Sequence, residues 1–448
     1  METTELLRKY NIAAPRYTSY PTVPYWDSES FEGPAWKSRL LSAYRENREE
    51  GISLYLHLPF CESLCTYCGC NTRITKNHGV ELPYIEALLR EWEVYVGLLG
   101  ERPKIKEIHL GGGTPTFFSA ANLKQLLEGI AGASQFEATV ACSFEGHPDN
   151  TTLEHLQTLY RLGFKRVSFG IQDFDPKVQF MINRYQTPAQ VQHITTLARD
   201  LGYQSINYDL IYGLPGQRME GLVETINEVI GLKPDRIAFY SYAHVPWIKA
   251  GQRHFTEADL PQGDEKFALY QKGREMLMAA GYEEIGMDHF ALRTDSLYVA
   301  YQENKLHRNF MGYTDQHTQI LLGLGVSSIS DCGTAFAQNA KTVEEYKQHI
   351  LEGDLAVQKG HLLTGEDLRI RQHILNLMCQ SSTCFDGEVP VEVMERLQPM
   401  IADRLVAIRN REVKILPLGR SFLRNVCMAF DDRLWQKQPQ TQLFSAAI

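Results

Sequence analysis

The sequence predicts an α/β fold in which a partial parallel (β/α)6 barrel is followed by a mainly helical C-terminal domain. Between residues 53 and 243, six short runs rich in β-branched and aromatic residues alternate with longer segments of helical period. Such alternation is typical of βα units and a parallel sheet. Several of the runs end in glycine, carboxylate or amide residues, and parallel barrels bind their ligands at the carboxyl ends of the strands. We therefore expect these chain positions to meet at one mouth.

The expected strands follow one another at intervals of about 30–35 residues, which suits βα units. They cover residues 53–60, 106–111, 138–145, 166–172, 205–212 and 236–243. Between the first two, Pro83 can open a helix in which Ile85, Leu88 and Trp92 recur at steps of three and four residues. A seventh run, residues 282–290, either extends the sheet or leaves it.

Beyond about residue 330 the pattern becomes mainly helical. Residues 368–378, 391–406 and 420–430 have helical period, and residues 412–417 form a short expected strand. Their order suggests a small winged-helix-like unit, for which packing as a lid is favoured over DNA binding. We expect three parts: an N-terminal segment (1–50) packing over the active site, a catalytic barrel (51–300) and this C-terminal domain (301–448).

Composition excludes several classes of protein. The 448 residues are 44% hydrophobic and 22% charged, which is typical of a globular chain and not of a disordered one. The formal net charge is −9, which argues against a protein held to nucleic acid or to an anionic membrane by its overall field. No uncharged apolar run approaches the ~18 residues of a spanning helix, and the first residues lack the pattern of a secretory leader. We expect a cytoplasmic protein whose anionic ligands meet a local basic pocket.

Four of the nine cysteines lie within ten residues and carry the strongest chemical signal. Cys61, Cys65 and Cys68 have C-x₃-C-x₂-C spacing, and Cys70 follows. A short loop with this spacing can hold three corners of a [4Fe–4S] cluster and leave the fourth iron open. A structural zinc site in a regulator is the alternative, although zinc normally closes four ligands. The remaining cysteines are expected to be small buried hydrophobes: Cys142, Cys332, Cys379, Cys384 and Cys427.

A glycine run follows the second expected strand. Gly111, Gly112 and Gly113 precede Thr114, and residues without side chains allow a cofactor to approach the backbone. Taken alone, the run is more typical of a plain turn, and its position behind the cysteine loop is what favours a role toward a cofactor.

The cysteine spacing after a first strand resembles the signature of the radical S-adenosylmethionine (SAM) superfamily. The resemblance implies a partial (β/α)6 barrel of radical SAM type, with the open iron binding SAM. It further implies that an electron passing through the cluster cleaves SAM to a 5′-deoxyadenosyl radical, which removes hydrogen from the substrate.

Further motifs resemble one family within that superfamily, the oxygen-independent coproporphyrinogen III oxidases. They span nearly the whole chain: residues 16–22 (RYTSYPT), 170–174 (GIQDF), 209–215 (DLIYGLP), 286–290 (GMDHF) and 307–310 (HRNF). The related heme-chaperone branch, which binds and transfers heme, is the alternative. It usually has an aromatic residue in place of Cys70 and lacks the first motif, so the enzyme is favoured.

The resemblance implies oxidative decarboxylation of two propionates of coproporphyrinogen III to vinyl groups, giving protoporphyrinogen IX. The implied partners are this substrate and an electron donor such as a flavodoxin- or ferredoxin-type protein. We expect a monomer with two bound SAM molecules.

Family roles transfer to matching positions. Cys61, Cys65 and Cys68 match the cluster ligands, and Cys70 matches a cysteine that does not bind iron. The positions around the iron-bound SAM are Tyr55, Gly112, Glu145, Ala243 and Ile329. Those around a second SAM are Tyr67, Gly113, Thr114, Gln172, Arg184 and Asp209. Carboxylates can accept hydrogen bonds from an amino group or ribose, and Arg184 can bind a carboxylate with its fork. Each of these polar residues could instead satisfy only a neighbour.

The candidate catalytic residues are Cys70, His57, Asp288 and His289. His57 could bind a cluster sulfur, position the loop or be a satisfied core histidine. Asp288 and His289 could handle a pyrrole proton or a substrate carboxylate, or only hold a strand. Arg16 and Arg308 are candidates for the four substrate carboxylates.

Two positions depart from the family pattern. Met311 stands where glutamine is common, so a polar contact from that position is absent. His147 lies in a Glu-Gly-His-Pro segment that replaces Glu-Val-Asp-Pro, so the shape of that loop is in doubt.

Overall fold

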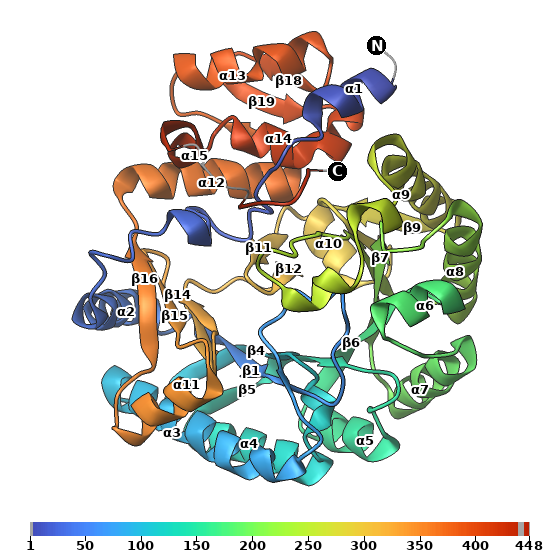
Figure 1. The fold of residues 1–448 in the computed structure, drawn as a ribbon. Helices are drawn as coiled ribbons and strands as arrows, with labels where there is room; N and C mark the ends of the chain where they lie inside the picture. Colours follow the sequence, from blue (N-terminus) through green and yellow to red (C-terminus); the bar gives the residue numbers. More distant parts are fainter. Residues whose placement is uncertain (1–2, 438–442, 448) are drawn as a thin grey trace.

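A 12-stranded sheet forms the centre of the computed structural model, which describes residues 3–437 and 443–447 (Figure 1). Six neighbouring strands run parallel, as the sequence predicts. They are β1 (Ile52–Leu58), β4 (Lys104–Gly112), β5 (Gln135–Gly146), β6 (Phe164–Gln172), β7 (Ser205–Tyr212) and β8 (Arg236–Ser241). Their carboxyl ends therefore share one edge.

Helices cover the outside of this curved sheet (Figure 1). They are α3 (Glu81–Leu99), α4 (Ala120–Gly132), α5 (Leu153–Arg161), α6 (Pro176–Ile182), α7 (Pro188–Leu201), α8 (Met219–Leu232) and α9 (Gly263–Ala279). Local signals set their ends, because Thr152 and Thr187 form capping boxes that begin α5 and α7. No helix in the described part of the chain is both long and apolar enough to cross a membrane.

The seventh run folds as a hairpin. Strand β9 (Tyr282–Ile285) turns at Gly286, whose φ is +63°, into β10 (His289–Leu292), which pairs antiparallel with β8. Only glycine adopts this φ freely, and a Cβ there would also overlap the Tyr313 ring. Helix α10 (Ser296–Gln302) and the short hairpin β11 (His307–Asn309) and β12 (Gly312–Thr314) follow.

The sheet continues past residue 300, where the sequence interpretation ended the catalytic barrel. Strands β13 (Leu321–Leu324), β14 (Ile329–Asp331), β15 (Ala335–Asn339) and β16 (Val357–Leu362) extend it beyond β1, with α11 (Val343–Leu351) between the last two. β13 pairs parallel with β1. These strands have three to six residues each, too few to establish a period in the sequence, and tertiary pairing defines them.

The remainder of the chain forms a separate small sheet with helices. Helix α12 (Gly365–Gln380), β17 (Ser382–Cys384), α13 (Val391–Ala402), β18 (Val406–Arg409), β19 (Glu412–Ile415), α14 (Leu423–Met428) and α15 (Asp432–Gln436) follow in order. The expected helix over 391–406 ends at Ala402, because Arg404 takes a left-handed conformation before β18 begins.

The N-terminal segment binds to this C-terminal unit. In α1 (Thr3–Tyr10), Lys9 and Tyr10 both bind Asp403, and Ala13 bridges to Ala446. Helix α2 (Gly33–Asn47) packs on β15 and β16. The two helices of the segment therefore lie against the C-terminal unit and the last strands of the sheet, and Arg16 between them reaches the Ser241 carbonyl at the carboxyl end of β8.

Candidate active site

The cysteine loop leaves the carboxyl end of β1 and is closed at its base. Strands β2 (Phe60–Cys61) and β3 (Arg73–Ile74) pair within the loop, and the Arg73 and Thr75 amides donate to the carbonyls of Pro59 and Cys61 at 2.8 and 2.9 Å. Cys61, Cys65, Cys68 and Cys70 are free and line a cavity of about 1090 Å³. The loop thus presents all four thiols to one space.

The surroundings of the three predicted ligands fit an iron–sulfur cluster. Thr114 Oγ1 lies 3.3 Å from Cys61 Sγ, and Arg184 Nη1 donates to Cys65 Sγ at 3.7 Å. The Cys70 amide donates to Cys68 Sγ at 3.4 Å. Donors of this kind stabilise thiolate ligands and tune the potential of a cluster. Among the described residues, no three His, Cys, Asp or Glu side chains are placed to hold a single metal ion. A cubic cluster makes a different demand, because each of its three thiolates would bind a different iron.

The glycine run packs directly beneath the cysteine loop. The amides of Gly113 and Thr114 donate to the carbonyls of Leu58 and Phe60 at 2.8 and 3.0 Å. A Cβ on Gly113 would lie 2.6 Å from the Pro59 carbonyl oxygen, and Gly112 has a φ of +115°. The fold itself requires these glycines, in addition to any role toward a cofactor.

His57 positions the loop. Its Nδ1 lies 3.0 Å from the Tyr55 hydroxyl and its Nε2 lies 2.9 Å from the Asn71 carbonyl, just after Cys70. Both ring nitrogens are thereby used, and burial lowers the pKa of the imidazole. These contacts favour the positioning interpretation over a contact with cluster sulfur.

Two carboxylates that line the cavity, Glu145 and Asp209, differ in charge. Burial alone would raise the pKa of Glu145, but His109, whose Nε2 is 3.5 Å away, and the Gly112 amide lower it below its usual value. Burial and the nearby Glu145 raise the pKa of Asp209 to about 6. The first carboxylate is therefore ionised at neutral pH, while the second lies close to its titration range.

Gln172 and Arg184 present unused polar atoms. Gln172 Oε1 and Arg184 Nε are buried without a hydrogen-bond partner in the described structure. Burial favours the neutral guanidinium, but Tyr67 and Cys65 raise the pKa of Arg184 overall, so it stays charged. Unpaired buried polar groups are rare in folded proteins, and they suit a polar ligand.

The structure gathers most, but not all, of the predicted site residues. Around the cavity lie the four cysteines together with Tyr67, Gly112, Gly113, Thr114, Glu145, Gln172, Arg184, Asp209 and His289. Outside the lining formed by the described residues are Arg16, Tyr55, His57, Ala243, Asp288, Arg308 and Ile329. Of these, Tyr55 still stacks on His109 with ring centroids 6.0 Å apart, and Ile329 packs against Trp26 and Phe336.

Asp288 and His289 form a pair at the cavity wall. Asp288 Oδ1 lies 3.0 Å from His289 Nδ1, and the Tyr240 hydroxyl lies 3.4 Å from His289 Nε2. Burial would raise the pKa of Asp288, but His289 and Arg308 lower it overall. An ionised carboxylate therefore orients an imidazole that reaches the cavity.

The two predicted substrate arginines occupy different places. Arg16 donates to the Ser241 carbonyl at 2.5 Å and lines a separate cavity of about 30 Å³. Arg308 is buried behind the cavity wall, with its guanidinium carbon 4.5 Å from the centroid of the Tyr313 ring. Its Nε and Nη1 have no partner in the described structure.

The two departures from the family pattern both line the cavity. Met311 presents its apolar side chain there, and its amide donates to Asn309 Oδ1 at 2.9 Å. Burial lowers the pKa of His147 to about 3, so its ring is neutral. Among the scattered cysteines one expectation is wrong, since Cys384 is exposed at the end of β17.

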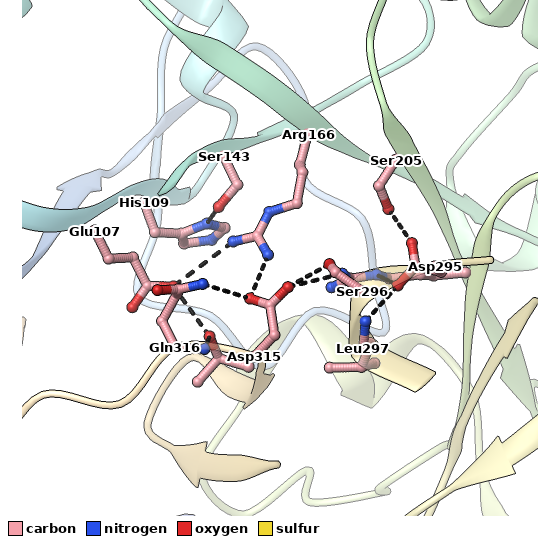
Figure 2. Close-up of polar contacts among 12 residues, drawn as sticks. Glu107, His109, Ser143, Arg166, Ser205, Asp295, Ser296, Leu297, Asp315 and Gln316 are labelled. Atoms are coloured by element: carbon pink, nitrogen blue, oxygen red, sulfur yellow. Dashed lines mark hydrogen bonds and ion pairs between the residues drawn. The ribbon is translucent and has the colours of Figure 1, made fainter. Parts of the chain in front are cut away.

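Sequence reasoning missed the polar floor of the barrel (Figure 2). Arg166 lies 2.8 Å from Asp315 and 3.7 Å from Glu107, and Arg236 lies 2.6 Å from Asp295. A signal was present, because polar residues alternate along the strands: Glu107 and His109, Ser143 and Glu145, Arg166 and Ser168, and Ser205, Asn207 and Asp209. Residues two apart face the same side, which here is the barrel interior.

Comparison with known proteins adds independent findings. A family model described as the radical SAM superfamily matches residues 55–229. The chain is 39% identical to the oxygen-independent coproporphyrinogen III oxidase of Salmonella typhimurium over 453 aligned positions, covering 99% of this chain and 98% of the relative. It is 38% identical to the protein of that name from Escherichia coli, with the same coverage. A solved structure of coproporphyrinogen III oxidase from Escherichia coli, described as a radical SAM enzyme, superposes with a TM-score of 0.88 at 38% identity, covering 93% of this chain and 97% of that one.

Proposed function

The chain belongs to the family of oxygen-independent coproporphyrinogen III oxidases within the radical SAM superfamily, and from this we propose how its residues divide the work of that reaction. The reaction converts coproporphyrinogen III to protoporphyrinogen IX without oxygen. When bound, the cluster and SAM supply the one-electron chemistry that removes hydrogen from a propionate side chain. One observation carries the assignment of residues: the four cysteines open onto the same cavity as Glu145, Arg184 and Asp209.

Cys61, Cys65 and Cys68 hold the cluster in this proposal, and Cys70 supports it through its amide contact with Cys68. The ionised Glu145 accepts a hydrogen bond from the amino group of an iron-bound SAM, next to Gly112. Tyr55, Ala243 and Ile329 belong to the same expected set of SAM-binding positions. In this proposal they act from behind the cavity wall, because none of them is part of the lining formed by the described residues.

A second SAM is the finer part of the proposal. Arg184 and Gln172 have buried polar atoms without partners, and both line the cavity with Tyr67, Gly113, Thr114 and Asp209. A charged guanidinium beside an amide suits the carboxylate and amino group of an amino acid. These unpaired atoms support a second polar ligand.

At the substrate end, His289 holds or moves a proton at Nε2 while Asp288 fixes the ring through Nδ1. Arg308 binds a substrate carboxylate, which its charge and two unpaired nitrogens support. Arg16 stays a weaker proposal, because it lies at the small separate cavity. We further propose a monomer acting in the cytoplasm with a flavodoxin- or ferredoxin-type donor, in keeping with the sequence.

The test is anaerobic incubation of reconstituted protein with coproporphyrinogen III, SAM and dithionite. We expect protoporphyrinogen IX and 5′-deoxyadenosine from the natural chain and from a Cys384→Ala control. Cys68→Ala should lose cluster absorbance and product, whereas Cys70→Ala should keep the absorbance. A fully reconstituted cluster that forms no product, or transferable heme binding without deoxyadenosine, would refute the assignment and favour a heme carrier.

A further inference from the structure

The surface around the cysteine loop is built from three segments that contact one another. The Thr66 amide donates to the Ile182 carbonyl at 3.0 Å, which joins the loop to residues 176–185. Gln252 Nε2 donates to the Tyr67 carbonyl at 2.9 Å, which joins it to residues 245–254. In Figure 1 the blue loop and the yellow-green segment accordingly lie side by side near the centre of the view. We call residues 60–78, 176–185 and 245–254 the loop face.

Exposed apolar side chains are concentrated on the loop face. The face holds 39 of the 448 residues. It carries six of the seventeen large apolar side chains that are exposed in the described part of the chain: Leu64, Ile74 and Tyr185, which also line the cavity, and Phe180, Trp247 and Ile248, which do not. Phe180 is 72% exposed. A cluster of exposed apolar and aromatic residues is typical of a surface that binds another protein.

The charge of the loop face opposes that of the whole chain. The chain has a net charge of −9, but the loop face has six lysines and arginines against a single acid, Glu62. Arg184 and Lys76 among them line the cavity, while Arg73, Lys177 and Arg253 are exposed away from its lining and Lys249 is half-buried. Glu344, outside the face, pairs with Arg73 at 3.2 Å. A surface that carries basic side chains together with exposed apolar ones is complementary to an acidic partner.

The redox loop lies between this face and the cavity. Glu62, Ser63, Leu64, Gly69 and Cys70 are exposed and also line the cavity, and Lys249 Nζ donates to the Cys70 carbonyl at 3.0 Å. A partner that covers the loop face therefore approaches the cluster ligands closely. Resting on the function proposed above, we propose that the loop face docks a small acidic protein that donates one electron at a time. In the docked complex the donor loses one electron and the cluster gains it, and no covalent bond forms or breaks.

The test measures binding as well as turnover. The triple variant Arg73→Glu, Lys177→Glu, Arg253→Glu changes one exposed cation in each segment. A matched triple, Lys124→Glu, Lys305→Glu, Arg409→Glu, changes the net charge equally at exposed positions elsewhere. Each protein, with its cluster reconstituted, is titrated anaerobically with a purified flavodoxin of net negative charge, at low and at physiological ionic strength (about 0.15 M). Turnover is measured with this flavodoxin and, separately, with dithionite.

We expect the loop-face triple to weaken flavodoxin binding at least ~10-fold at low salt, and to slow flavodoxin-driven turnover, with normal dithionite-driven turnover. The matched triple should bind as the natural chain does. Phe180→Ser, which leaves the charge unchanged, should also weaken binding, because it removes apolar contact area. Absence of product with dithionite from the natural chain would refute the proposed function, while the titration would still report on docking.

Three results would overturn the docking proposal. Equal weakening by both triples would show that only net charge matters. A loss of dithionite-driven turnover in the loop-face triple would assign the face to substrate entry. A change of oligomeric state with unchanged flavodoxin binding would assign it to a second copy of the chain.

Discussion

Replacing Arg308 with methionine should stabilise the protein and impair its reaction at the same time. The side chain is only 8% exposed, and two of its nitrogens have no hydrogen-bond partner among the described residues. Burial would lower the pKa of the guanidinium, but Tyr313 and Asp288 raise it overall, so the charge remains. Such a group lowers the stability of the free protein, and it offers a charge and two hydrogen-bond donors to an anionic substrate.

The stability change is the sum of opposing effects. Each unmet buried donor costs about 1–3 kcal/mol, so the two together cost about 2–6 kcal/mol. The contact of the guanidinium with the Tyr313 ring at 4.5 Å stabilises the folded state by about 2 kcal/mol for a desolvated cation. Attraction to Asp288 offsets part of the remaining cost of the unmet donors. We therefore expect Arg308→Met to raise the free energy of unfolding by about 1 kcal/mol, within the range found when buried charges are replaced by apolar groups.

The catalytic change has the opposite sign. A hydrogen bond between a guanidinium and a carboxylate contributes about 1.5–3 kcal/mol, so its loss should lower kcat/KM for coproporphyrinogen III about 10- to 150-fold. Denaturant unfolding and anaerobic turnover with dithionite measure the two effects. Arg308→Lys, which keeps the charge without the planar fork, should recover part of the activity.

Arg424 supplies the matched control. It is equally buried, but its guanidinium donates to the carbonyls of Pro15, Ala446 and Ala447. Arg424→Met should therefore destabilise the protein by about 2 kcal/mol or more, because it leaves these acceptors unpaired. If Arg308→Met destabilised the protein as Arg424→Met does and left kcat/KM unchanged, the assignment of Arg308 to the substrate would be wrong.

Three further outcomes follow from Gly113, Glu91 and Asp315. Gly113→Ala should lower the iron bound per chain, because its Cβ would lie 2.6 Å from the Pro59 oxygen; Gly132→Ala, with open space around it, should not. Burial raises the pKa of Glu91 to about 7, above its unfolded value of 4.5, so the folded state keeps the proton longer. The free energy of unfolding should thus fall by about 3 kcal/mol as pH rises from 4.5 to 7. The free energy of unfolding of Glu91→Gln should not show this decrease. Arg166 and Arg236 hold the pKa of Asp315 low despite burial, so Asp315→Asn should cost about 3 kcal/mol at neutral pH, and the difference should shrink progressively as pH falls below about 4 toward the lowered pKa of the folded state. A flat difference across pH would contradict either assignment.

Local patterns predicted the features that depend on near neighbours in the chain. The six parallel strands were recognised because each is a continuous run between turn residues, and the cysteine loop because its ligands lie within eight residues. The glycine run was recognised for the same reason. Its main structural cause, contact with Pro59 more than fifty residues earlier, was not visible in the sequence.

Features that join distant segments were missed or misplaced. The barrel floor joins Glu107, Arg166 and Asp315, which come from three separate parts of the chain. Glu91 in α3 accepts hydrogen bonds from Gly325, Asn339 and Tyr346, which attaches the late strands to the early barrel. Those late strands are too short to show a period, so only their pairing defines them.

By itself, the sequence determined the chemistry of this protein: three thiols on one loop, a glycine run after the second strand, and carboxylates near the carboxyl ends of expected strands. The tertiary structure alone decided which of these groups share a cavity, which are charged, and that the N-terminal segment lies against the C-terminal unit. The physical reason is that residue type and spacing are local properties of a chain. Burial and charge depend on which distant segments come together when it folds.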